Sequence, residues 1–149
     1  MVTAKDLLTA VNRVLVEEYP DRTVYVTDCP KDFKRPSFLL ETVRVSRNDA
    51  AYGTVAKTVY QTITCFIPID KQYRSNPNEL MELQDAVMQL FSCGFVQVGD
   101  RAIKLQSLSG ETDNEAAYVD LQFQYYDDRS AEADTAPTMS NITIKLQEG

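Results

Sequence analysis

The residues that come closest to a chemical site are the acidic cluster Glu111-Thr-Asp-Asn-Glu115. The carboxylates of Glu111, Asp113 and Glu115 stand at alternate positions, a spacing at which oxygen ligands can converge on a hard cation such as Ca²⁺. The cluster lacks both the glycine and the terminal bidentate glutamate of a calcium loop. We therefore interpret it as a solvated turn between two strands and predict no metal site.

Other catalytic chemistry is poorly represented in this sequence. There is no histidine, which excludes Ser-His and Cys-His nucleophile pairs and any imidazole acid, base or metal ligand. The five glycines are too scattered for a phosphate-binding loop or a dinucleotide fingerprint. The three cysteines, Cys29, Cys65 and Cys93, have no CxxC spacing and are predicted to be buried free thiols. We predict no catalytic residue, no cofactor and no enzymatic activity.

The chain is acidic, with a formal net charge of −7 at pH 7. This charge argues against ordinary binding of duplex nucleic acid, but an acidic wall would keep a passing duplex from sticking. Residues 106–128 contain six acidic residues and no Lys or Arg. Two interpretations stay open for this run: a solvated face, or a functional electronegative surface. The candidates for such a surface are Glu111, Asp113, Glu115 and Asp120.

The elements that must position these side chains follow from local patterns. An N-cap at Thr3 begins a first amphipathic helix, and Asn76-Pro77-Asn78-Glu79 begins a second. Strands are predicted at residues 23–27, 36–46, 54–70, 95–98, 101–108 and 115–126. The order of helix, three strands, helix and three strands predicts an α+β fold, with a mostly antiparallel sheet and both helices packed on one face.

The strands at 36–46 and 54–70 form a long predicted hairpin around residues 47–53. Apolar alternation at Ile63 and Cys65 gives way at the same parity to Lys57 and Gln61 toward the turn. The base of the hairpin is therefore predicted to be buried and its tip to project. We name the exposed tip as a candidate interface, although Tyr52 has the alternative of folding back onto its own hairpin. The candidate residues of the tip are Arg47, Asn48, Asp49 and Tyr52.

The last residues of the sequence form a separate predicted part. A spacer rich in Pro, Ser, Ala and acidic residues, 129–141, leads to one strand in which Ile142, Ile144 and Leu146 share a face. A lone strand is not stable, so this one needs a sheet edge on its own domain or on a neighbouring copy. We predict a domain at residues 1–128 and a linker with a strand arm at residues 129–149, a design for assembly rather than chemistry.

Several segments of the chain resemble one known family. They are Met1-Val-Thr-Ala-Lys-Asp-Leu-Leu8, Val24-Tyr-Val26, Pro36-Ser-Phe38, Pro77-Asn-Glu-Leu80 and Tyr118-Val-Asp-Leu-Gln-Phe123. Over about residues 1–127 the chain resembles the tail terminator proteins of contractile-tailed phages and phage-like particles of Gram-positive bacteria. The resemblance implies a homohexameric ring that caps the tail tube, stops its polymerisation, and docks the neck or head and the last sheath ring. The implied partners are further copies of the chain, the tail tube protein, the sheath protein and the neck and head connector proteins, with DNA only as passing cargo.

The implied location is the tail or neck of the virion, after assembly in the host cytoplasm. No apolar run is long enough to cross a membrane, and the first residues lack a leader pattern, so we expect synthesis in the cytosol. Alternatives are another neck or tube-completion subunit, a small regulatory module that binds a ligand or peptide, and, more distantly, an enzyme.

Overall fold

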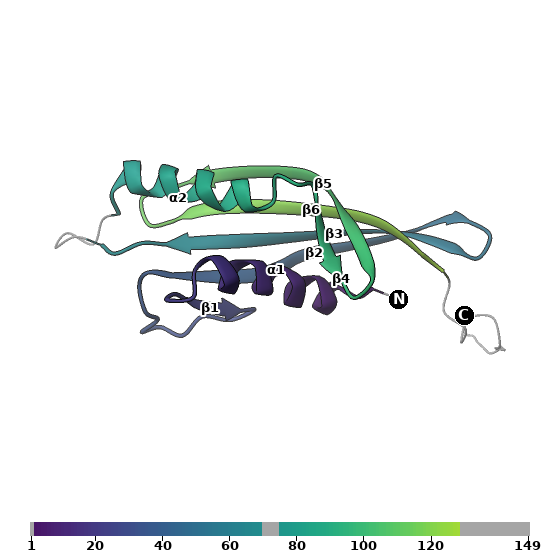
Figure 1. Ribbon diagram of the computed structural model, residues 1–149, viewed down its shortest axis with the longest axis horizontal. Coiled ribbons are helices and arrows are strands. Elements are labelled where there is room, and N and C mark those ends of the chain that lie inside the picture. Colours follow the sequence, from purple (N-terminus) through teal and green to yellow (C-terminus); the bar gives the residue numbers. More distant parts are fainter. Residues whose placement is uncertain (1, 70–74, 129–149) are drawn as a thin grey trace.

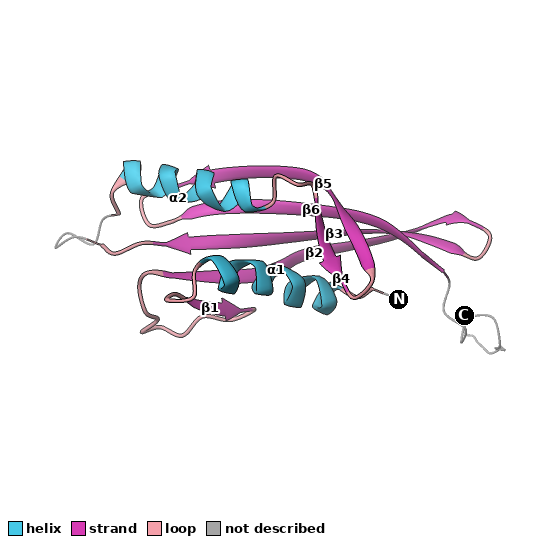
Figure 2. Ribbon diagram, in the orientation of Figure 1, coloured by secondary structure: helices cyan, strands magenta, loops and turns pink. Residues whose placement is uncertain are grey.

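A computed structural model describes residues 2–69 and 75–128, which form two helices and six strands (Figures 1 and 2). The order along the chain is the predicted one: α1 (Ala4–Glu18), β1 (Thr23–Val26), β2 (Ser37–Ala51), β3 (Thr54–Phe66), α2 (Pro77–Leu90), β4 (Phe95–Val98), β5 (Arg101–Thr112) and β6 (Ala117–Asp128). The strand predicted around Ile142, Ile144 and Leu146 lies outside the described residues.

Both helices begin where the sequence predicted. The Thr3 hydroxyl accepts a hydrogen bond from the Asp6 N–H at 3.1 Å, and the Asp6 carboxylate accepts one from the Thr3 N–H at 2.9 Å, which completes a capping box. At α2 the side chain of Asn76 accepts from the N–H groups of Asn78 and Glu79. These bonds satisfy amide donors that have no partner inside the helix.

The six strands form one curled sheet in the order β1-β2-β3-β6-β5-β4. All neighbours are antiparallel except β1 and β2, which are parallel. Each helix contacts the side of the sheet that carries the buried residues of β3 and β6, such as Ile63 and Val119. The α+β class, the mostly antiparallel sheet and the two helices packed on one face are confirmed.

The sheet curls because β5 has an irregularity between Leu105 and Ser107. Beyond it, the β4–β5 hairpin passes over α1, so that β4 contacts this helix (Figure 1). Helix α1 is therefore enclosed by β1 and β2 on one side and by β4 on the other. A bulge that bends a strand is a common way to close a sheet over its core.

The strand boundaries correct two predictions. The segment 47–53 is not a loop, because β2 keeps pairing with β3 as far as Ala51 and leaves only Tyr52 and Gly53 at the turn. Gly53 has φ 78°, a conformation that glycine adopts without steric cost. In the other direction β3 ends at Phe66 rather than at residue 70, and Pro68, which has no N–H to donate, follows closely.

The polarity of Lys57 and Gln61 indicated that the buried face of the hairpin ends near them, and this prediction was wrong. Lys57 and Gln61 are only 7% and 1% exposed, and Val55, still closer to the turn, is also buried. The segment that precedes α1 covers them and satisfies their polar ends. Lys57 Nζ donates to the Val2 carbonyl at 3.3 Å, and Gln61 Nε2 donates to the Ala4 carbonyl at 3.3 Å.

The cysteines also differ from the prediction of three buried thiols. Cys65 is buried, and burial raises its pKa to about 12, so this thiol is unreactive at neutral pH. Cys29 is half-buried and Cys93 is exposed at the end of α2. Cys29 lies in an irregular segment after β1 and Cys93 in the turn after α2, where a small side chain needs no place in the core. Neither described helix is long and apolar enough to span a membrane.

Candidate assembly surfaces

The tip of the β2–β3 hairpin forms one end of the molecule (Figure 1). The structure brings together all four residues that the sequence singled out there, on a ribbon in which Arg47 pairs with Lys57 and Asp49 with Val55. Arg47, Asn48 and Asp49 are exposed. Tyr52 has 104% of its reference surface exposed, so it projects from the turn and does not fold back onto its own hairpin.

The outer edge of β2 is a second surface, which we call the β2 edge and define as residues 41–51. Strand β1 pairs only with residues 37–40 of β2, and none of the described strands pairs with the β2 edge on its outer side. Val43 and Val45 on this edge are 64% and 53% exposed. An unpaired edge with apolar side chains is a template for another strand.

Two irregularities divide the β2 edge into shorter pieces. The pairing of β2 with β3 shifts between Thr42 and Arg44, and again between Asp49 and Ala51. Residues 44–49 between these shifts pair regularly with β3. This edge was not predicted from the sequence, because local patterns predict a strand but not which of its sides finds a partner.

The face of the sheet opposite the helices is polar. Its outward side chains on β3 and β6 are mainly Thr, Tyr, Gln and Asp, and the Thr62 hydroxyl donates to Asp120 Oδ1 at 2.7 Å. A shallow hollow of about 310 Å³ lies on this face. Its lining residues are Val43, Arg44, Tyr60, Gln61, Thr62, Ser107, Ser109, Asp120, Leu121 and Gln122. Asp120 thus lies on this face, while the other three candidate acids are in or beside the β5–β6 turn.

The acidic cluster at the β5–β6 turn is organised around Asp113. Its Oδ1 accepts from the N–H groups of Glu115 and Ala116 at 2.7 and 2.9 Å, and its Oδ2 accepts from the Tyr118 hydroxyl at 2.7 Å. The hydrogen bond from Tyr118 lowers the pKa of Asp113, and the same bond raises the pKa of Tyr118 to about 12. This carboxylate therefore ties the turn together. No group of acidic or thiol side chains within residues 2–69 and 75–128 is arranged to hold a metal ion.

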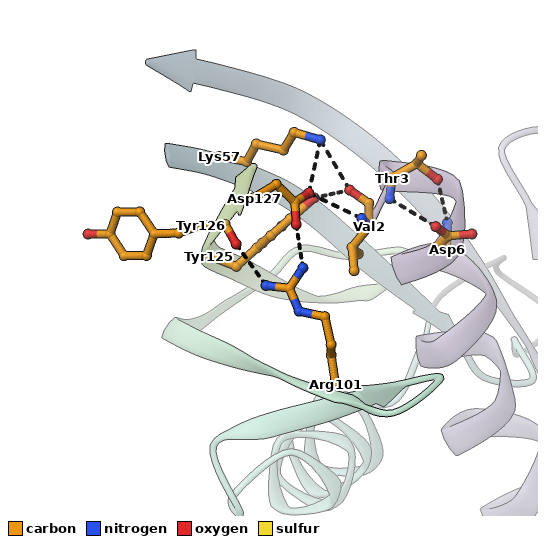
Figure 3. Close-up of polar contacts among 8 residues, drawn as sticks. All are labelled: Val2, Thr3, Asp6, Lys57, Arg101, Tyr125, Tyr126 and Asp127. Carbon is orange, nitrogen blue, oxygen red and sulfur yellow. Dashed lines mark hydrogen bonds and ion pairs between the residues drawn. The ribbon is translucent and has the colours of Figure 1, made fainter. Parts of the chain in front are cut away.

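An ionic cluster around the buried side chains of Lys57 and Asp127, which we call the N-terminal latch, joins Val2, Lys57, Arg101, Tyr125 and Asp127 (Figure 3). Asp127 Oδ2 accepts from the Val2 N–H at 3.1 Å and lies 3.2 Å from Lys57 Nζ. Arg101 reaches Asp127 Oδ1 from the start of β5, and the Tyr125 hydroxyl donates to the Val2 carbonyl at 2.8 Å. The latch fastens the start of the chain to three strands near the base of the hairpin tip.

The pKa of Asp127 reflects two opposing effects. Burial by itself would raise it, but hydrogen bonds from Arg101, from the Val2 N–H and from Lys57 lower it, and the result lies below the ordinary value. The carboxylate is therefore ionised at neutral pH. The latch was not predicted from the sequence, although Lys57 and Asp127 both stand at the buried parity of their strands, which is a readable signal.

A family model described as "Phage tail terminator protein" matches residues 6–135. No curated protein matches. One solved structure is similar to this chain at 13% identity, with 87% of this chain and 98% of the other covered and a TM-score of 0.44.

The family match extends over both helices and all six strands. It corresponds to a structural component of the phage tail, and therefore of the virion, and not to an enzyme family. The chain belongs to the phage tail terminator protein family.

Proposed function

We propose that this chain is a tail terminator subunit that forms a homohexameric ring on the tail tube and stops its polymerisation. The observation that carries the proposal is the projecting hairpin tip, in which Tyr52 is fully exposed, together with the adjoining unpaired β2 edge. In a closed ring, one surface of each subunit binds a different surface of the next subunit. A projecting ribbon and an open edge on the same subunit supply surfaces of that kind.

We propose that the tip residues Arg47, Asn48, Asp49 and Tyr52 contact a neighbouring subunit or the tube. Exposed aromatic and arginine side chains are enriched in protein interfaces. The latch supports this role, because it fixes β3 and β6 at the base of the tip through buried ionic contacts. A rigid base lowers the entropy cost of presenting the tip to a partner.

The remaining partners follow from the same proposal. The ring would present one face to the tail tube protein and the other to the neck and head connector proteins, and in a contractile particle of a Gram-positive host it would hold the last ring of sheath protein. Assembly would take place in the host cytoplasm. The acidic chain, with Glu111, Asp113, Glu115 and Asp120 as candidate lumen residues, suits a passage that DNA crosses without binding.

Native mass spectrometry of the purified full-length chain, with negative-stain imaging, tests the ring. The proposal predicts six copies in a closed ring. A purified tail tube protein, polymerised with and without this chain, tests termination, and shorter tubes with a ring at one end are expected. A monomer or dimer that leaves tube length unchanged would refute the proposal and favour a binding module.

A further inference from the structure

We propose that the β2 edge is the acceptor for the segment 142–146 of an adjacent copy of this chain, which adds a strand to the sheet in line with β1. This inference rests on the proposed ring, because the ring places a second copy beside each β2 edge. It assigns a partner strand to an edge with which none of the described strands pairs on its outer side, and an acceptor to a segment whose sequence requires one.

The length of the edge fits the length of the segment. Residues 44–49 form a regular stretch of six residues between two shifts in register, and the segment 142–146 has five. A strand added to an edge makes main-chain hydrogen bonds along its whole length, and its alternate side chains decide specificity. A stretch limited by two irregularities accepts a short strand and rejects a long one.

The side-chain pattern of the segment fits the two faces of the edge. Ile142, Ile144 and Leu146 share one face of an extended strand, while Thr143 and Lys145 point the other way. Val45 of β2 pairs with Val59, whose side chain belongs to the core face. Residues directly opposite each other on paired strands lie on the same face, so the three apolar residues would stand beside Val45 and cover it.

A groove beside the edge would receive these apolar side chains. Between β1, β2 and the first turns of α1 there is a hollow of about 370 Å³. It is lined by Ala4, Lys5, Leu8, Thr9, Asn12, Val26, Thr27 and Thr42. The hollow begins where β1 ends, at Val26 and Thr27, and reaches β2 at Thr42, next to the unpaired stretch.

The position at which the described chain ends makes the exchange possible. Asp128 ends β6 opposite Thr54, beside the turn at the outer end of the hairpin tip. The thirteen residues 129–141 span at most about 43–47 Å when extended. Six strands spaced about 4.8 Å apart place the outer strands of a flat sheet roughly 24 Å from each other. This length exceeds the width of such a sheet, so the spacer is long enough to extend beyond its own subunit.

Disulfide trapping between two differently tagged preparations tests the inference. Both carry Cys29→Ser and Cys93→Ser and keep the buried Cys65. One adds Val45→Cys; the other adds a cysteine at one position from 142 to 146. The two are assembled together under mild oxidation, and heterodimers are scored by denaturing electrophoresis. Cross-links are expected with Ile142→Cys, Ile144→Cys or Leu146→Cys, and their loss is expected with Thr143→Cys and Lys145→Cys, which point to the opposite face.

A matched control and a direct count of rings separate the possible failures. Phe95→Cys, an exposed position on β4, replaces Val45→Cys and should give no heterodimer. Native mass spectrometry of the same mixture reports the ring. Rings without the alternating cross-links would refute the inference and leave the proposed function standing. A cross-link found only within one chain, in Val45→Cys with Ile144→Cys, would refute exchange between copies. Absence of both rings and cross-links would refute both proposals.

Discussion

Lys57 Nζ lies 3.2 Å from Asp127 Oδ2 across two adjacent antiparallel strands, and both side chains are buried. The Val2 carbonyl accepts from the same amine, and the Val2 N–H donates to the same carboxylate oxygen. The Lys57–Asp127 ion pair thus binds both the N–H and the carbonyl group of Val2, which precedes α1. The free energy of this arrangement depends on Asp127, because each of the other groups in the latch except Tyr125 contacts it.

Replacing Asp127 tests the latch. Asp127→Asn removes the charge that Lys57 and Arg101 face, so we expect the free energy of unfolding to fall by about 2–3 kcal/mol. Urea denaturation followed by circular dichroism measures the loss. Glu111→Gln, at an exposed position, is the control and should change stability by less than about 0.5 kcal/mol. Equal stability of the Asp127 variant and the wild type would show that the latch is not needed for folding.

The latch also predicts how stability depends on pH. The pKa of Asp127 is lower in the folded chain than in the unfolded chain, so its contribution is present above the unfolded value of about 3.9 and is lost as the pH falls through the lowered folded value. The difference in unfolding free energy between wild type and Asp127→Asn should therefore shrink below about pH 4. Denaturation curves at pH 7 and at pH 3 measure it, and a constant difference would contradict the assignment.

Gly110 of β5 lies against the Gln84 side chain of α2 and the Tyr118 carbonyl of β6. A Cβ atom at this position would lie 2.7 Å from Gln84 Nε2 and 2.8 Å from the Tyr118 carbonyl oxygen. We expect Gly110→Ala to cost about 1–3 kcal/mol of stability, measured by urea denaturation. The double variant with Gln84→Ala should recover part of this loss, because the contact with the Tyr118 carbonyl stays. A neutral Gly110→Ala would mean that α2 shifts freely on the sheet.

The exposed tip predicts a variant that separates folding from assembly. Tyr52→Ser removes an aromatic ring that contacts no core, so the unfolding free energy should change by less than about 0.5 kcal/mol. Ring formation or tube capping should weaken by at least about tenfold, as expected for an aromatic residue at the centre of an interface. Native mass spectrometry and tube-length distributions measure these effects. Met81→Ser on α2, a control with an exposed apolar residue, should leave assembly intact; equal behaviour of the two variants would remove the tip from the interface.

The proposed division of the chain at residue 128 predicts the outcome of truncation. All residues of the described core lie between Val2 and Tyr125, so deleting residues 129–149 should leave a body that unfolds cooperatively. Rings formed by this truncated chain should dissociate at a higher concentration than those of the full chain, because each loses one added strand per interface. Size-exclusion chromatography at several concentrations measures the shift. A truncated chain that does not fold would show that the last residues belong to the body.

The sequence predicted local structure well, because local structure depends on residues that are close along the chain. Caps at Thr3 and Asn76 and the alternation in β6 each determine one element with little help from the rest of the fold. The order of elements and the α+β class follow from these signals. Strand ends were less accurate, since β2 continues to Ala51 only because β3 stands beside it.

By itself the sequence determined the helices, the strands, their order and the absence of histidine chemistry. Tertiary structure decided which polar residues are buried: Lys57 and Asp127 stand at core positions because the segment at Val2 covers them and each neutralises the other. It also decided that β1 covers only four residues of β2 and leaves residues 41–51 open. Strand parity places Lys57 and Asp127 on the core face, but the segment that covers them and the strand that β2 lacks on its outer side both depend on parts distant in the chain, which local patterns do not encode.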